Sequence, residues 1–115
     1  MASKDKDALL QGTLDLLVLK ALQLGPMHGW GITERLARGS KDVLRIGEGS
    51  LYPALYRLER QGVIASKWDT TENNRRARYY ALTNTGRARL ADERQAWRRM
   101  SRAVELVLAM ESAGE

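Results

Sequence analysis

Apolar residues along this chain form four stretches with helical spacing and two short stretches with the composition of β-strands. The first helical stretch, residues 9–24, is apolar nearly all round, and a helix of that kind is buried on more than one side. In so small a domain we expect the second side to meet another chain. Gly25-Pro26 ends this helix, and the polar residues 1–8 before it are predicted to form a flexible arm.

A helix-turn-helix is predicted next. The second helix covers about residues 28–38, and a connector at residues 41–47 follows, with a brief extended piece at 43–46. The third helix covers residues 51–61, with Ser50 as its N-cap. Two helices joined by a glycine-containing connector at this spacing are typical of a helix-turn-helix.

The third helix has two different faces at 100° per residue. Its inward positions are leucines: Leu51, Leu55 and Leu58. Its outward positions are aromatic, basic or proline: Pro53, Tyr56, Arg57 and Arg60. Folding requires the first group but not the second, and Tyr and Arg side chains suit phosphates and base edges in a major groove. A solvated basic face and a recognition helix both remain open on this pattern alone.

The periodicity then changes to that of strands. Residues 63–68 and 77–82 are rich in β-branched and aromatic side chains and flank a polar stretch, which predicts a β-hairpin. Asn73-Asn74 suits the turn because Asn tolerates a positive φ. Helices followed by such a hairpin indicate a mostly α-helical α+β fold, the winged helix-turn-helix.

The last predicted element is a long helix from Thr83 or Thr85, as N-cap, to about Met110. Its apolar residues recur about every seven positions and form a narrow seam. The apolar surface along this helix is larger than a short chain can cover by itself, so we expect a homodimer. The predicted dimer interface consists of Leu10, Leu14, Leu17, Leu90, Trp97, Met100, Val104 and Val107.

Composition narrows the class of function. Lys and Arg number 19 against 14 Asp and Glu, a net charge of +5 that favours a polyanionic partner. There is no cysteine, His28 is the single histidine, and no phosphate-binding loop occurs. We therefore expect no enzyme, no cofactor and no bound metal. Without a signal sequence or an apolar run of membrane length, the protein is expected to be cytoplasmic and not membrane-bound.

Four segments resemble the PadR family of bacterial transcriptional regulators, in its compact subgroup with one C-terminal helix. They are residues 11–14, 25–32, 49–59 and 75–86. The most specific parts are the helix start Ser50-Leu51-Tyr52-Pro53 and the wing exit Tyr79-Tyr80-x-Leu82-Thr83-x-x-Gly86. The resemblance implies an arm at 1–8, a winged helix-turn-helix domain at 9–83 and a dimerisation helix at 84–115.

The resemblance also implies a homodimeric repressor that binds a pseudo-palindromic operator in double-stranded DNA. Its targets would be its own operon or genes for efflux and stress. On the third helix, Ser50 and Tyr52 are expected at phosphate or at the groove edge, although a core role for Tyr52 stays open. Tyr56 and Arg57 are expected in the groove, and Arg60 near the DNA backbone. In the wing, the expected contacts to phosphate or to the minor groove are Arg75, Arg76 and Arg78.

Two alternatives concern Trp97 and the partner of the whole domain. Trp97 is either a dimer anchor or, paired with its copy across a two-fold axis, a binding site for a small planar aromatic effector. The domain could instead be a winged-helix module that binds protein without sequence-specific DNA binding.

Overall fold

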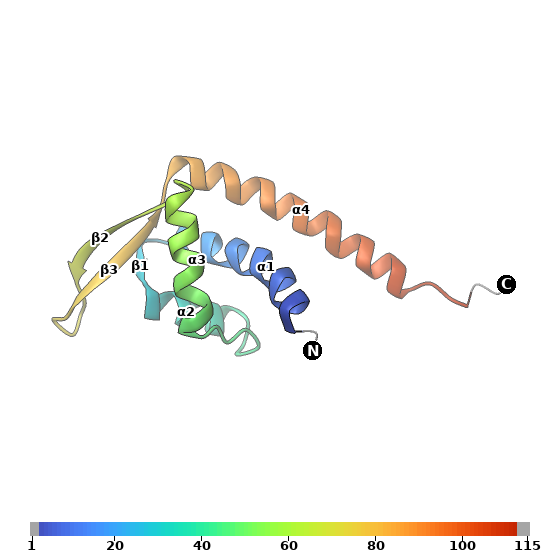
Figure 1. Ribbon diagram of the computed structural model, residues 1–115, viewed down its shortest axis with the longest axis horizontal. Coiled ribbons are helices and arrows are strands. Elements are labelled where there is room, and N and C mark those ends of the chain that lie inside the picture. The colour runs from blue at the N-terminus through green and yellow to red at the C-terminus, as the bar shows by residue number, and fades with distance from the viewer. Residues whose placement is uncertain (1–2, 113–115) are drawn as a thin grey trace.

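The computed structural model describes the backbone of residues 3–112 and the side chains from residue 12 to residue 112. A helical body carries a β-hairpin on one side and a long helix that projects on the other (Figure 1). In chain order the elements are α1 (Ser3–Gln23), β1 (Met27–His28), α2 (Gly29–Gly39), α3 (Glu48–Arg60), β2 (Ile64–Thr70), β3 (Arg76–Leu82) and α4 (Asn84–Leu108). The predicted class, a mostly helical winged helix-turn-helix with a long last helix, is confirmed.

The core lies where α1, α2 and α3 meet the base of the sheet and the first turns of α4. Its largest fully buried side chains are all branched aliphatic: Val18, Leu19, Ile32, Leu51, Leu55, Leu58, Val63 and Ile64. The three leucines predicted to form the inward face of the third helix are all among them. Burial of this aliphatic surface is the main force that holds the three helices together.

Helix α1 differs from the prediction at its start. It begins at Ser3, so most of the segment 1–8 that was expected to be a flexible arm is helical. Residues 3–8 contain neither Gly nor Pro, so nothing in their backbone prevents the helix from extending. Residues 1–2 lie outside the described chain, and the side chain of Leu10 lies outside the described residues.

The inner face of α1 is used within its own chain. Leu14 is 9% exposed and belongs to the core, so it has little surface left to offer a partner, and its place in a dimer interface stays a prediction. Leu17 is partly buried and packs against the same core. The prediction that α1 is buried on several sides is confirmed, since it contacts α2, α3, α4 and β3.

The helix-turn-helix has the predicted order, with a different N-cap on its second helix, α3. His28 is the N-cap of α2, where its Nδ1 accepts a hydrogen bond from the Gly31 N–H at 3.0 Å. Helix α3 begins at Glu48 with Gly47 as N-cap, so the prediction of Ser50 as the cap is wrong; Ser50 lies in the first turn. Pro53 consequently falls in the second turn, where it cannot donate to the Gly49 carbonyl.

The sheet has three antiparallel strands in the order β1-β3-β2, one more than the hairpin that was predicted. The additional strand pairs Met27 with Tyr80 and His28 with Tyr79. An extended piece was expected at 43–46 instead, but those residues form no strand. The hairpin turn is as predicted, with Asn74 at a φ of 63°.

Helix α4 begins at a joint with the turn between α3 and β2. The Thr83 hydroxyl accepts from the Gly86 N–H at 3.0 Å and donates to the Gly62 carbonyl at 2.8 Å. The Thr83 N–H donates to the Val63 carbonyl at 3.2 Å. Gly86 packs against that same carbonyl so closely that a Cβ would overlap its oxygen. We call Gly62, Val63, Thr83 and Gly86 the α4 joint.

Beyond the joint, α4 leaves the body (Figure 1) and gives the molecule its length, with extents of 65 × 29 × 25 Å. Leu90, in the second turn, is 3% exposed in the core of its own chain. Leu90 therefore has little surface left to offer a partner, and its place in a dimer interface stays a prediction. No helix among residues 3–112 combines the length and apolar character that a membrane span requires.

Candidate nucleic-acid interface

The outer face of α3, by which we mean Pro53, Tyr56 and Arg60, points away from the core. Tyr56 is 66% exposed, and the Arg60 guanidinium carbon lies 5.6 Å from the centre of its ring. The two residues are one helical turn apart, which brings an aromatic ring and a cation together on one surface. Ser50 is also exposed, one turn nearer the start of the helix.

Tyr52 has a packing role as well as an exposed edge. Its ring lies against the backbone of Gly29, where any Cβ would overlap the tyrosine hydroxyl. The side chain therefore fixes the start of α3 on the start of α2. It nevertheless keeps 44% of its surface exposed, so Tyr52 remains available at the rim of the outer face.

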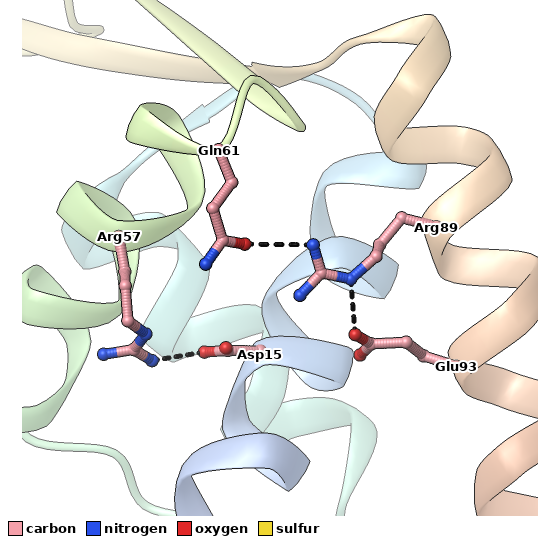
Figure 2. A network of polar contacts seen from close by, with 5 residues as sticks. All are labelled: Asp15, Arg57, Gln61, Arg89 and Glu93. Carbon is pink, nitrogen blue, oxygen red and sulfur yellow. Dashed lines mark hydrogen bonds and ion pairs between the residues drawn. The ribbon is translucent and has the colours of Figure 1, made fainter.

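Arg57 does not belong to the outer face, contrary to its predicted place in the groove. Its Nη2 donates to Asp15 Oδ1 on α1 at 2.6 Å (Figure 2). Arg57 lies about 100° around the helix from Tyr56, on the flank that faces α1. The sequence offered one signal for this contact: Asp15 interrupts an otherwise apolar run.

Asp15 is 8% exposed, and burial raises the pKa of its carboxyl above the ordinary value of 3.8. The hydrogen bond and the charge of Arg57 act in the opposite direction and lower the pKa. Burial dominates, so the pair is held in a poorly hydrated interface between α1 and α3. Its main effect is to orient Arg57.

A second set of polar contacts joins α3 to α4. Arg89 Nη1 donates to Gln61 Oε1 at 2.9 Å, and Arg89 Nε donates to Glu93 Oε2 at 2.5 Å. In Figure 2 this set lies beside the Asp15–Arg57 pair, so α1, α3 and α4 are linked through neighbouring polar side chains. The end of the helix-turn-helix is thus tied to the early turns of α4.

The wing carries a stack of three side chains that we call the wing stack: Trp68, Arg76 and Arg78. The guanidinium carbons of Arg76 and Arg78 lie 5.4 and 5.6 Å from the Trp68 ring. Trp68 is directly opposite Arg78 in the strand register. Because side chains alternate along a strand, Arg76 and Arg78 lie on one face of β3, and Arg75 lies in the loop before it. Sequence reasoning did not assign a role to Trp68.

The base of the wing stack is bonded to α3. Arg78 Nε donates to Ser66 Oγ at 2.8 Å, and Ser66 Oγ donates to Glu59 Oε2 at 2.6 Å. The Arg78 guanidinium also lies 4.0 Å from the Glu59 carboxylate. Glu59 belongs to α3, so this chain of contacts fixes the wing beside the helix that carries Tyr56 and Arg60.

The later part of α4 presents an apolar surface that its own chain leaves exposed. Trp97 is 48% exposed and Val104 45%. Met100 and Val107 on the same seam are exposed as well. Four of the residues predicted for a dimer interface are therefore accessible.

No cluster of side chains suited to bind a metal ion occurs in the part of the chain that the structure describes. Among residues 12–112 no three side chains of His, Cys, Asp or Glu gather as a metal site would require. His28 is engaged in capping α2.

Comparison with known proteins agrees with this geometry. Residues 18–92 match the model of the transcriptional regulator PadR-like family. The transcriptional regulator Rv3488 of Mycobacterium tuberculosis is 36% identical over 78 residues, which cover 68% of this chain and 69% of that protein. A PadR family regulator from Eggerthella lenta superposes with a TM-score of 0.76 at 31% identity, over 96% of this chain and 94% of the other. A PadR-like regulator from Bacillus cereus, at 24% identity, shares the fold with a TM-score of 0.75 over 90% and 99%. The chain therefore belongs to the PadR-like family of DNA-binding winged helix-turn-helix transcriptional regulators, and it is not an enzyme.

Proposed function

We propose that this protein is a homodimeric repressor that binds a pseudo-palindromic operator through the outer face of α3 and through the wing. One observation carries the proposal: two exposed surfaces, both rich in Arg and aromatic side chains, lie next to each other and are connected by hydrogen bonds. Tyr56 and Arg60 form the first, the wing stack forms the second, and Glu59 connects them. Neither surface serves the core, and both have the chemistry that phosphates and base edges attract.

The proposed roles on α3 follow from exposure. Tyr56, which is 66% exposed on the outer face, would reach base edges. Arg60, Ser50 and the exposed edge of Tyr52 would contact phosphate at the rim of the groove. Arg57, held by Asp15, would act on DNA only through the placement of α3.

The wing would supply contacts that depend little on sequence. Arg75 in the turn and Arg76 and Arg78 on the strand present three cations within four residues. Such cations bind phosphates or enter a narrow minor groove. Binding through them should weaken steeply as salt rises, because each phosphate contact releases counterions.

A dimer through α4 would give the molecule two such surfaces. The exposed seam Trp97, Met100, Val104 and Val107 is the proposed interface. Two recognition helices related by a two-fold axis fit successive major grooves of a palindromic site. Control of its own operon, or of efflux or stress genes, is the proposed biological role.

Trp97 would also serve a small planar aromatic effector. It lies midway along the seam with about half of its surface exposed, so two copies across a dimer axis could sandwich a flat ring. Quenching of tryptophan fluorescence by planar aromatic compounds, lost in Trp97→Leu, would support this role. Because Trp30 and Trp68 are present too, quenching that persists in the variant would mean that the compound binds near another tryptophan and not at Trp97.

The test of the proposal is a fluorescence-anisotropy titration of labelled DNA from upstream of the gene. A scrambled duplex at the same near-physiological salt is the control. We expect a preference of about a hundredfold or more for the upstream DNA. Equal weak binding to both would place the operator elsewhere, and no binding to either would favour a module that binds protein.

Two variants separate reading of sequence from attraction to phosphate. Arg76→Ala should weaken binding to all DNA to a similar degree, because phosphate contacts carry no sequence information. Tyr56→Ala should reduce the difference in binding affinity between operator DNA and scrambled DNA. Uniform loss in both variants would refute this division of roles.

A further inference from the structure

Trp68 is a large aromatic residue whose side chain is not needed to stabilise the fold. Its side chain is 55% exposed near the outer part of β2. The residues that follow it on this strand, Asp69 and Thr70, are also exposed. An exposed Trp beyond the core contributes little to the stability of the domain, so its value lies in what it contacts.

Those contacts are the two arginines of the wing stack. Both guanidinium carbons lie within the distance of about 6 Å at which an aromatic face attracts a cation. Trp68 stands directly opposite Arg78, while Arg76 lies on the same sheet face two residues further along β3. One ring therefore contacts both cations at once.

The two arginines differ in what else fixes them. Arg78 is also bonded to Ser66 and lies near Glu59, which tether it to α3. Within residues 12–112, Arg76 has no carboxylate within ion-pair distance. Among these residues its charge has no ion-pair partner, and its guanidinium carbon lies 5.4 Å from the centre of the Trp68 ring.

We infer that Trp68 is a positioning residue for DNA binding, whose ring holds Arg76 and Arg78 as a pre-ordered pair of phosphate contacts. The inference rests on the proposed function. A long, flexible Arg side chain on a hairpin loses rotamer freedom when it binds. Prior ordering against the ring removes part of that loss, and preorganisation of this kind raises affinity without a new contact to the ligand.

The test compares Trp68→Leu with Trp68→Phe. Leucine keeps an apolar side chain and removes the ring, whereas phenylalanine keeps a ring that can still attract both cations. Binding is measured by anisotropy over a range of salt concentrations, with a duplex that the unchanged protein binds. Thermal unfolding of each variant verifies that the fold is intact, which the exposure of Trp68 leads us to expect.

Trp68→Leu should weaken binding to operator and scrambled DNA alike, by about fivefold, the equivalent of one or two exposed cation–π contacts. The slope of log K against log salt should stay nearly unchanged, because both arginines can still contact phosphate in the bound state. Trp68→Phe should remain within about twofold of the unchanged protein. In an Arg76→Ala, Arg78→Ala background, Trp68→Leu should have almost no further effect, since the ring then has no cation to position.

The inference is overturned if Trp68→Leu binds with unchanged affinity. It is also overturned if affinity falls equally in both backgrounds, because the indole would then contact DNA itself. Failure of the unchanged protein to bind any duplex would refute the proposed function instead. The two failures are therefore distinguishable.

Discussion

The two ends of the Asp15–Arg57 pair differ in burial, and this difference predicts an asymmetric response to mutation. The Asp15 side chain is 12% exposed, whereas the Arg57 side chain is 30% exposed. Arg57→Met leaves a carboxylate without its partner between α1 and α3. Asp15→Asn leaves a guanidinium that water can reach. We expect Arg57→Met to lower the free energy of unfolding much more than Asp15→Asn does.

The magnitude follows from what each variant leaves behind. Removal of one partner from a buried ion pair costs about 3–5 kcal/mol, and the partial access of water here favours about 3 kcal/mol for Arg57→Met. Asparagine at position 15 keeps an oxygen that can accept from Arg57 and removes a desolvated charge, so its cost should be about 1 kcal/mol or less. At about 4 °C per kcal/mol for a domain of this size, the two midpoints should differ by roughly 8 °C.

The difference should grow with pH. Burial already raises the pKa of Asp15 above its ordinary value of 3.8, and loss of the Arg57 guanidinium removes the influence that lowers it. A carboxyl with a raised folded-state pKa binds its proton more tightly when folded. Its contribution to stability is therefore greatest below the ordinary pKa and is lost as pH rises through the folded-state pKa. Arg57→Met should lose stability from about pH 4 upward, relative to a protein in which position 15 does not titrate.

The assay is thermal unfolding followed by circular dichroism at several pH values. Protein concentration is held fixed, because the proposed dimerisation would make the midpoint depend on concentration. The reference is the double variant Asp15→Asn, Arg57→Met, which lacks the titrating group. Equal midpoints for the two single variants at high pH, or a pH-independent gap between Arg57→Met and the double variant, would refute the account of a desolvated carboxylate.

Three further predictions concern α1 and α4. Gly86→Ala should lower the midpoint of thermal unfolding sharply, because its Cβ would overlap the Val63 carbonyl oxygen. Gly12 is helical with open space around it, so Gly12→Ala should raise the free energy of unfolding by up to about 1 kcal/mol. A Gly86→Ala variant with an unchanged midpoint would argue against the close contact. Leu90→Ala should cost about 2–5 kcal/mol of unfolding free energy, since the side chain is buried in its own chain, and a loss of dimer without loss of stability would contradict that. Val104→Asp should dissociate the proposed dimer in sedimentation experiments while far-ultraviolet circular dichroism stays unchanged; an intact dimer would exclude this part of the seam.

The elements that could be predicted from the sequence are those in which apolar residues recur at regular spacing. The inward leucines of α3 recur with helical spacing, and all three are buried. The strand β1, by contrast, has only two residues, Met27 and His28, which is too short for any alternation to be seen. It exists because the edge of β3 offers backbone partners to it, and a one-dimensional pattern does not contain that information.

The residue types of the candidate site could be predicted from the sequence, but the direction in which each side chain points could not. Arg57 and Arg60 have the same residue type on the same helix, yet Asp15, 42 positions earlier in the chain, orients the first of them toward α1. Trp68 could have been found from the strand register, because a hairpin centred near Asn73-Asn74 pairs it with Arg78. Spacing along the sequence thus identifies faces, and tertiary contacts decide which side chains remain free on them.

The α4 joint makes the long helix a lever for the recognition surface. Gly62 and Val63 lie in the turn between α3 and β2. Thr83 and Gly86 hold this turn to the start of α4. With 25 residues, α4 is about 37 Å long, so a shift of about 3 Å at its far end corresponds to a tilt of only about 5° at the joint. In a dimer built through α4, the packing of the far seam therefore sets the distance between the two recognition helices finely. Operator half-site spacing would then be encoded in α4, well away from any residue that touches a base.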